Sequence, residues 1–348
     1  MNAIVDRVSQ TVQRNCDIAD ARHGADFGMC TYLMKMREYF RWEKGLGFHD
    51  RLPKDEVGDW LSAREALWAE LVEADFSEVT VGDDSYDAFD ADGINAALEP
   101  YQLVYSAGLA LGAKPHFFLG RLWHKETPRD GFDLRVADAE LARGLSAPPA
   151  MTRGRTIFLR REALRRYLWE KLESWRWNRL DNAFGRAVAC YPFEADLDTA
   201  LDGMTDNELA SAREHEIGEF LAGEHLGEAW NRLLLALVRT PAELMARAVR
   251  DHIADCTRTL PMLVESGRDA SIHFFAGNLT AMRRDIFPGL QQAYEAWRAT
   301  GDVAPLAAIA EKGREHWTGV AEELLDLHRC YGPDVAVPAA TVVTANRL

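Results

Sequence analysis

The chain has 348 residues and a formal net charge of −15, from 40 Lys and Arg against 55 Asp and Glu. This acidic balance argues against nucleic acid as the main partner, because duplex binding depends on neutralising phosphates with basic residues. Hydrophobic residues make up 47% and charged residues 27% of the chain, which is typical of a folded globular protein. The length fits about two domains, at ~150 residues each.

The cysteines and the N-terminus bear on where the protein resides. The five cysteines are an odd number and include no Cys-x-x-Cys pair, so the sequence predicts a reducing compartment, without a disulfide framework or zinc knuckle. The polar first twenty residues do not resemble a signal peptide. The longest apolar run, LLLALV at 233–238, is far shorter than the ~20 residues that cross a bilayer. We therefore expect a bacterial cytoplasmic protein that does not enter a membrane.

In the first half of the chain, the hydrophobic pattern changes from helical to alternating. Apolar residues recur every three, four or seven positions over 17–44, which predicts one long amphipathic helix. A second helix is predicted over 53–74, with proline and two acidic residues in its first turn. Residues 82–93 form an acidic loop. Over 101–159, short apolar or alternating runs separated by turn residues predict a small antiparallel sheet.

After residue 160 the helical pattern returns. Thr205 and Thr240 are each followed three residues later by Glu, which predicts a capping box at the start of two helices. Residues 333–348 contain two prolines and no clear period, so we expect a tail. The sequence thus predicts a mainly α protein, a multi-helix bundle with a small antiparallel β element in the middle of the chain. Its predicted parts are an N-terminal helical region with the β element (1–159), a C-terminal helical bundle (160–332) and the tail (333–348).

Three familiar motifs are incomplete in this chain. Residues 88–99 resemble a calcium loop, but Ala88 stands at the first ligand position. Residues 108–115 resemble a phosphate loop, but a proline follows the lysine. His215 begins a His-Glu-x-x-Glu run, in which Glu219 replaces the second histidine of a zinc protease. None of these motifs supports a functional assignment.

Histidines and carboxylates pair at helical spacing in the C-terminal part of the chain. Residues three or four positions apart lie on one helical face, as in the iron and manganese sites of helical bundles. With 55 acidic residues in 348, however, chance gives roughly half of all histidines such a partner. The number of pairs therefore carries no weight. The four pairs are His215/Glu219, His225/Glu228, His252/Asp255 and Asp269/His273.

The position of these pairs carries more weight than their number. The apolar stripe of the helix after Thr205 extends backwards onto Glu219 and His215, and His252 shares a stripe with Cys256. A buried carboxylate or imidazole is costly unless it is paired or metal-bound, and this ligand set suits iron or manganese. The alternative is a buried polar network that orders the bundle. The predicted metal ligands are His215, Glu219, His252, Asp255, Asp269 and His273.

Residues 153–179 form a basic and aromatic segment, with nine Arg or Lys against three Glu. Such a segment suits an anionic ligand or an acidic partner surface, and its tryptophans suit stacking on an aromatic ligand. The alternative is an amphipathic helix whose Trp and Leu face the core, while its arginines are solvated or pair with acidic residues. The candidate anion-binding residues are Arg160, Arg161, Arg165 and Arg166.

The segments CDIADARHGADFGMC, KPHFFLGRLW and EHEIGEFL resemble those of an uncharacterised proteobacterial family, over most of the chain. This resemblance implies no activity and no site residues. From the residues themselves, the leading hypothesis is a metal-dependent enzyme, in particular a non-haem iron oxidoreductase that uses oxygen. The alternative hypothesis is a non-catalytic helical scaffold that binds an anionic small molecule or an acidic protein partner through residues 153–179.

Overall fold

The structure is a computed structural model that describes residues 3–110, 113–128 and 131–348. The chain divides into two compact units. The first comprises Met1–Arg129, Asp133–Pro149 and Phe158–Trp169, and the second comprises Asp130–Phe132, Ala150–Ile157 and Glu170–Leu348.

The first unit begins with three helices, α1 (Ala3–His23), α2 (Met29–Glu43) and α3 (Lys54–Leu71). The prediction of one helix over 17–44 is wrong, because a 3-10 turn, η1 (Gly24–Asp26), separates α1 from α2. Glycine weakens a helix interior, and Gly28 has the extended backbone of an N-cap residue. The predicted helix over 53–74 is confirmed as α3.

A short hairpin and a helix follow. Strands β1 (Val79–Val81) and β2 (Asp84–Tyr86) pair antiparallel. Helix α4 (Ala91–Leu98) begins after Asp90, whose carboxylate accepts a hydrogen bond from the Gly93 N–H group, and a 3-10 turn, η2 (Glu99–Tyr101), ends it. The predicted acidic loop over 82–93 therefore contains a strand and a helix start.

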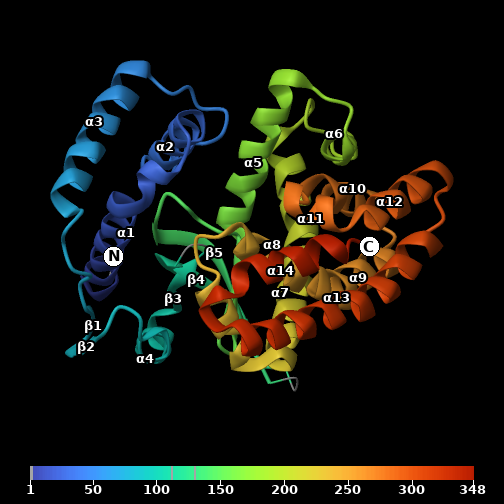
Figure 1. Ribbon diagram of the computed structural model, residues 1–348. Helices are drawn as coiled ribbons and strands as arrows, with labels where there is room; N and C mark the ends of the chain where they lie inside the picture. Colours follow the sequence, from blue (N-terminus) through green and yellow to red (C-terminus); the bar gives the residue numbers. More distant parts are fainter. Residues whose placement is uncertain (1–2, 111–112, 129–130) are drawn as a thin grey trace. The chain divides into compact units, whose positions relative to one another are not determined.

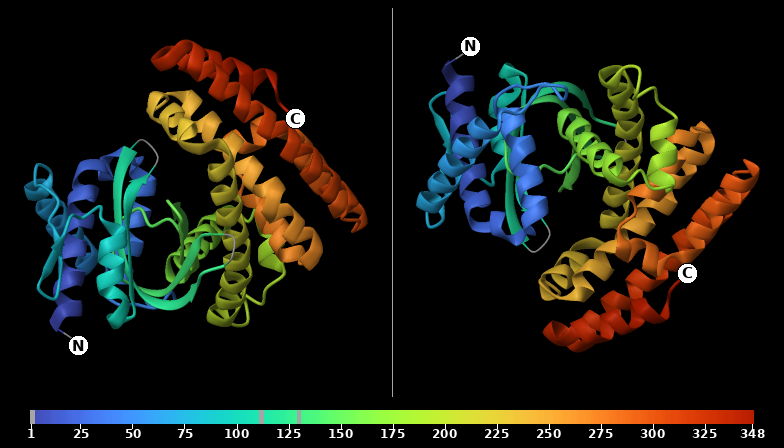
Figure 2. Two further views of the ribbon diagram at one scale, coloured as in Figure 1. Left: turned by 90° about the horizontal axis from the view of Figure 1, so that it is seen from below. Right: turned by 90° about the horizontal axis from the view of Figure 1, so that it is seen from above.

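The main sheet has five strands in the order β3-β4-β5-β7-β6. Strand β4 pairs antiparallel with both β3 and β5, so that Leu119 lies opposite Tyr105 on one side and Ala142 on the other. Helix α1 runs alongside β4 and β5 (Figures 1 and 2), and its buried Val8, Val12 and Cys16 share a core with the sheet. The strands are β3 (Leu103–Ala110), β4 (Lys114–Glu126), β5 (Asp133–Arg143), β6 (Ala150–Arg153) and β7 (Thr156–Arg160).

This sheet corrects the predicted fold class. The protein has an α+β fold, not a helical bundle with a small β element. Strand β5 has the sequence DLRVADAELAR, in which Ala, Asp and Glu are depleted in strands generally. Its extended conformation is stabilised by pairing with β4, and a local pattern does not reveal such a partner.

Helix α5 (Arg161–Asn178) leads from the first unit into the second. In the described residues of the second unit, the other elements are helices, apart from β6 and the start of β7. The longest helix, α7, contains a break at Gly227. Its elements are α6 (Ala183–Ala189), α7 (Leu197–Ala236), α8 (Pro241–Ala254), a π-helical segment η4 (Asp255–Thr259), α9 (Leu260–Ser266), α10 (Asp269–Asn278), α11 (Ala281–Ile286), α12 (Pro288–Thr300), α13 (Ala304–Tyr331), a 3-10 turn η5 (Gly332–Val335) and α14 (Ala336–Ala345).

The two predicted capping boxes have different outcomes. Thr205 lies inside α7, where its hydroxyl donates to the Leu201 carbonyl, so this box is wrong. The N-cap of α7 is Asp196, which accepts a hydrogen bond from the Thr199 N–H group. Thr240 is the N-cap residue of α8, and the Glu243 carboxylate accepts a hydrogen bond of 3.0 Å from the Arg239 N–H group. Thr240 itself caps no backbone N–H group with its side chain.

The predicted tail is also wrong, because residues 336–345 form helix α14. This helix contacts α8 and α13 (Figure 2) and buries Ala339 and Val343 in the core that they share. At the C-terminus, the Leu348 N–H group donates to the Ile286 carbonyl. Across the described residues, no helix has the length and apolar composition needed to cross a bilayer.

Candidate metal centre

A glycine brings the two halves of the candidate site together. Helix α7 packs against α8 and the π-helical segment. A Cβ atom at Gly218 would lie 2.5 Å from the Ala254 carbonyl oxygen and 2.8 Å from its Cα, so only glycine permits this approach of the two backbones. The close approach places His215 and Glu219 of α7 opposite acidic residues of α8.

Three side chains converge at this point. His215, Glu219 and Asp251 each offer one ligand atom, and these atoms lie within 4.8 Å of one another. The His215 Nε2 atom is 3.8 Å from the Glu219 Oε1 atom. Ligand atoms that share one ion at ~2.0–2.2 Å are at most about 4.4 Å apart, so small side-chain adjustments bring all three into coordination. All three residues are half-buried, so the site is not sealed.

A third carboxylate orients the histidine. The His215 Nδ1 atom lies 2.8 Å from the Oδ1 atom of Asp255, which is almost completely buried at the start of the π-helical segment. This contact keeps a proton on Nδ1 and leaves the lone pair of Nε2 free for a ligand. Metal-binding histidines commonly donate their other ring N–H group to a carboxylate in this way. Single-turn π segments within α-helices also occur often at functional sites.

Two arginines partly neutralise these acids. The Arg250 Nη2 atom donates to both oxygens of Glu219 at 2.8 Å, and Arg283 donates to the second oxygen of Asp255. Burial raises the pKa of Asp251, although Arg283 opposes the rise. For Glu219, the positive charge of Arg250 and its hydrogen bonds to the carboxylate outweigh burial and lower the pKa.

Glu216 adds another buried carboxylate to this region. It accepts a hydrogen bond of 2.8 Å from the Thr152 hydroxyl, and both burial and the charge of Glu219 raise its pKa. The described cluster therefore holds four carboxylates and two guanidinium groups around one imidazole. Such an excess of buried negative charge favours binding of a cation.

The structure brings together three of the six predicted metal ligands, His215, Glu219 and Asp255. His252 is placed elsewhere. It is fully buried, its Nε2 group donates to the Arg283 carbonyl at 3.0 Å, and its ring stacks on Trp317 at 5.3 Å. The sequence correctly assigned His252 to the buried stripe of its helix, but that stripe faces an aromatic core.

Asp269 and His273 lie on α10, away from these partners. The His273 Nδ1 atom is 2.8 Å from the Tyr294 hydroxyl, and its ring contacts Trp297 at 4.9 Å. Burial lowers the pKa of His273. These contacts give His273 a packing role, and neither residue belongs to the trio of ligand atoms.

Sequence reasoning missed Asp251. This residue lies four positions before Asp255 and so shares its helical face, as His215 shares that of Glu219. Two facing i, i+4 pairs on neighbouring helices were therefore present in the sequence. His252, the histidine of this stretch, points to another side of α8, toward Trp317.

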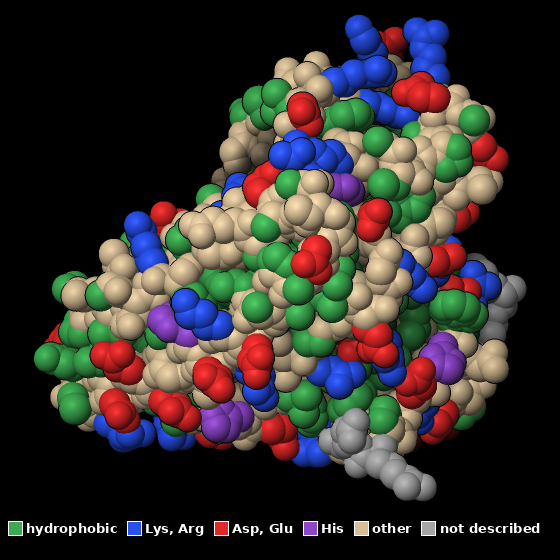
Figure 3. Space-filling model, turned by 90° about the vertical axis from the view of Figure 1, so that its right-hand side faces the viewer, with side chains coloured by type: hydrophobic (Ala, Val, Ile, Leu, Met, Phe, Trp, Pro, Cys, Tyr) green, Lys and Arg blue, Asp and Glu red, His purple; other side chains and the backbone are tan. Residues whose placement is uncertain are grey.

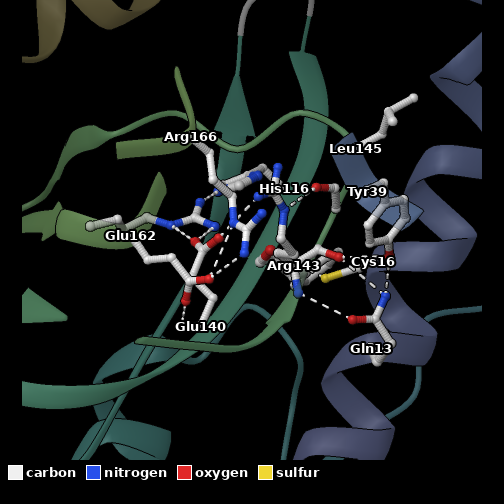
Figure 4. Close-up of polar contacts among 12 residues, drawn as sticks. Gln13, Cys16, Tyr39, His116, Glu140, Arg143, Leu145, Glu162 and Arg166 are labelled. Atoms are coloured by element: carbon white, nitrogen blue, oxygen red, sulfur yellow. Dashed lines mark hydrogen bonds and ion pairs between the residues drawn. The ribbon is translucent and has the colours of Figure 1, made fainter. Parts of the chain in front are cut away.

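Arg160, a candidate anion-binding residue, is fully buried within the first unit. Its Nε group donates to the Glu140 Oε1 atom at 2.6 Å, and its Nη1 group donates to the His116 Nε2 atom at 3.2 Å. Burial, with Arg160 and Arg143, lowers the pKa of His116 to about 3. Figure 4 shows this network of Glu140, His116 and Arg143 beside the sheet. The Arg160 guanidinium thus serves as an internal partner of Glu140.

The other three candidate arginines have separate surroundings. Arg166 donates two hydrogen bonds to Glu162, at 2.9 and 3.1 Å, and the Arg165 guanidinium lies over the Phe48 ring at 4.9 Å. Arg161 is half-buried at the first residue of α5. On the face drawn in Figure 3, basic and acidic side chains are interspersed.

The fold and the site together define an α+β protein with a cluster of one histidine and several carboxylates in its helical unit. The chain belongs to a family of unknown function (DUF6866), whose N-terminal domain matches residues 7–160 and whose C-terminal domain matches residues 165–346. The resemblance noted in the sequence is thus confirmed as one to a family without an assigned function. No curated protein and no solved structure matches the chain.

Proposed function

We propose that this protein is a metal-dependent enzyme whose centre is a single divalent cation, iron or manganese. The proposed ligands are the His215 Nε2 atom and one carboxylate oxygen each from Glu219 and Asp251. One observation carries this proposal: the three ligand atoms lie within 4.8 Å of one another, while Asp255 holds the opposite ring nitrogen of the histidine at 2.8 Å.

The composition of the site supports the choice of metal. One imidazole and two carboxylates form a hard nitrogen and oxygen set without thiolate, which suits iron and manganese. A cation at this point would also offset the excess of carboxylates over guanidinium groups. Because the ligands come from two helices held together through Gly218, the site is built into the packing of the unit.

The number of ligands supports catalysis over a purely structural role. Structural metal sites are usually closed by four protein ligands, whereas catalytic sites keep positions for water or substrate. Three ligands leave such positions, and the half-buried side chains allow a small molecule to reach them. Within this class we propose a non-haem oxidoreductase, because redox-active iron and manganese are the ions that the ligand set favours.

Metal analysis tests the proposal. Protein purified without chelators is expected to retain iron or manganese, and calorimetric titration of the metal-free protein with Mn²⁺ is expected to show one site. The changes His215→Ala, Glu219→Gln and Asp251→Asn should each abolish or strongly weaken that binding, since each removes one of three ligands.

The chain supplies a matched control. His225 and Glu322 form another His/carboxylate pair at 3.2 Å, but both side chains are more than half exposed. His225→Ala should leave Mn²⁺ binding unchanged. Equal Mn²⁺ affinity in the wild type and the His215→Ala protein, or no binding to the folded wild type, would show that the cluster is only a network of ion pairs.

A further inference from the structure

The second unit also contains a cavity of about 240 Å³ that is lined by residues from the end of α5, the start of α6 and α10. Lys171, Ser174, Trp175 and Asn178 of α5 line one wall. This volume is somewhat below the ~300–1,000 Å³ typical of sites for drug-sized ligands. The cavity therefore suits a small molecule.

Tight packing fixes the walls of this cavity. The Trp175 indole N–H group donates to the Leu180 carbonyl at 2.9 Å, and a Cβ atom at Gly185 would lie 2.8 Å from that indole nitrogen. At the other side, a Cβ atom at Gly277 would lie 2.6 Å from the Phe184 backbone nitrogen. A site preorganised in this way loses little entropy when a ligand binds.

The polar groups of the lining favour an anion. Lys171 is the charged residue among the lining residues, which include no carboxylate. Burial lowers the pKa of Lys171, and the positive charge of Arg284 lowers it further. A bound anion would offset both effects, because a nearby negative charge favours the ammonium form. The Asn182 carboxamide oxygen accepts a hydrogen bond from the Gly185 N–H group, so its NH₂ group is what it offers to a ligand.

The apolar groups of the lining favour a flat organic body. Trp175 and Phe184 contribute aromatic side chains and Leu180 an aliphatic one. Aromatic rings prefer stacked or edge contacts with other rings. A cationic group beside aromatic walls matches a ligand that has one charged end and one apolar end.

We propose that this cavity binds a small aromatic carboxylate, with its negative group at Lys171 and its ring against Trp175 and Phe184. The site is separate from the residues of the candidate metal centre, so either proposal can fail without the other. An anionic ligand was also expected for the basic segment 153–179. Here, however, the anion is bound by Lys171 and not by Arg160, Arg161, Arg165 and Arg166.

Titration of the full chain with benzoate, followed by calorimetry or ligand-observed NMR, tests this proposal. Benzoate should bind saturably, and the neutral isostere benzamide should bind at least about tenfold more weakly, which is the loss expected when one charge-assisted hydrogen bond is removed. Inorganic phosphate should also bind more weakly, because it lacks the ring. These comparisons use the wild-type protein and do not depend on the folding of a variant.

Variants assign the binding to the cavity. Lys171→Met should weaken benzoate binding by about tenfold or more, with the thermal midpoint measured alongside to confirm folding. Lys312, exposed on α13, is the matched control, and Lys312→Met should bind benzoate as the wild type does. The proposal is overturned if benzoate does not bind, if benzamide or phosphate binds equally well, or if Lys171→Met retains full affinity.

Discussion

The His215 Nδ1 atom and the Asp255 Oδ1 atom lie 2.8 Å apart, although the two residues are 40 positions apart in the chain. Asp255 is almost completely buried and also accepts a hydrogen bond from Arg283. This carboxylate is therefore held rigidly behind the imidazole. The relationship determines which ring nitrogen of His215 can act as a ligand, and with it the orientation of the candidate metal site.

Asp255→Asn tests this orienting role. An amide can donate its own hydrogen to Nδ1, which favours the tautomer with the proton on Nε2 and blocks the ligand position. We expect Mn²⁺ affinity to fall about 10- to 100-fold, as for other changes behind a metal-binding histidine. Asp326→Asn, at a mostly exposed position on α13, should not change the affinity. Unchanged binding by the folded Asp255→Asn protein would contradict the proposed tautomer.

Gly218→Ala tests whether the close approach of α7 and α8 builds the site. The added Cβ atom would meet backbone atoms of Ala254 at 2.5 Å, so the helices must separate. We expect a loss of about 1–3 kcal/mol in the free energy of unfolding, together with weaker Mn²⁺ binding. Gly223→Ala, in the same helix, meets nothing within 4 Å and should instead stabilise the protein by up to about 1 kcal/mol. Urea titrations of the two variants measure this contrast, which disappears if the contact is unimportant.

Asp20 is expected to make the stability of the protein depend on pH. Its carboxylate accepts a hydrogen bond of 2.7 Å from the Leu145 N–H group, but burial and the charge of Asp17 raise its pKa from 3.8 to about 8. Between these values the folded state holds a proton that the unfolded state has released. The contribution of Asp20 to stability therefore falls as pH rises from about 4 to about 8.

Asp20→Asn isolates this effect, because the amide resembles the protonated acid and still accepts the Leu145 hydrogen bond. The free energy of unfolding, measured by urea titration from pH 5 to pH 9, should fall more steeply for the wild type than for the variant, by up to about 1.4 kcal/mol per pH unit. The variant should be the more stable protein at alkaline pH. Parallel profiles for the two proteins would show that Asp20 ionises normally.

Arg160→Met distinguishes an internal ion pair from an anion-binding residue. Removing this fully buried guanidinium takes away the nearer of two cationic partners of the buried Glu140 carboxylate and leaves only Arg143, at 3.3 Å. We therefore expect a loss of up to about 3–5 kcal/mol in the free energy of unfolding. Arg160→Met combined with Glu140→Gln should recover part of that loss. Arg121→Ala removes an exposed pair with Asp138 and should cost at most about 1 kcal/mol. A stable Arg160→Met protein would contradict the buried role.

Local patterns in the sequence identified several features correctly. The proline and acidic residues near position 54 predicted the start of α3, and the apolar stripe of α7 led to His215 and Glu219 as inward-turned polar residues. These features depend on backbone propensity and on helical periodicity. Both act over a few residues and so can be read directly from the chain.

Tertiary packing decided which side chains contact each face of these helices. The stripe containing His252 is buried as predicted, but against Trp317. Asp251, on another side of the same helix, instead faces His215 and Glu219. In the first unit, β5 is a strand because β4 pairs with it, and Arg160 is buried because Glu140 neutralises it.

The sequence by itself therefore determined the negative net charge, helix α3, and three residues of the candidate site, His215, Glu219 and Asp255. The extent and strand order of the five-stranded sheet, the ligand Asp251 and the burial of Arg160 were decided only by the tertiary structure. The physical reason is that periodicity shows which side of an element avoids water. Which distant side chain covers that side depends on the packing of the whole unit.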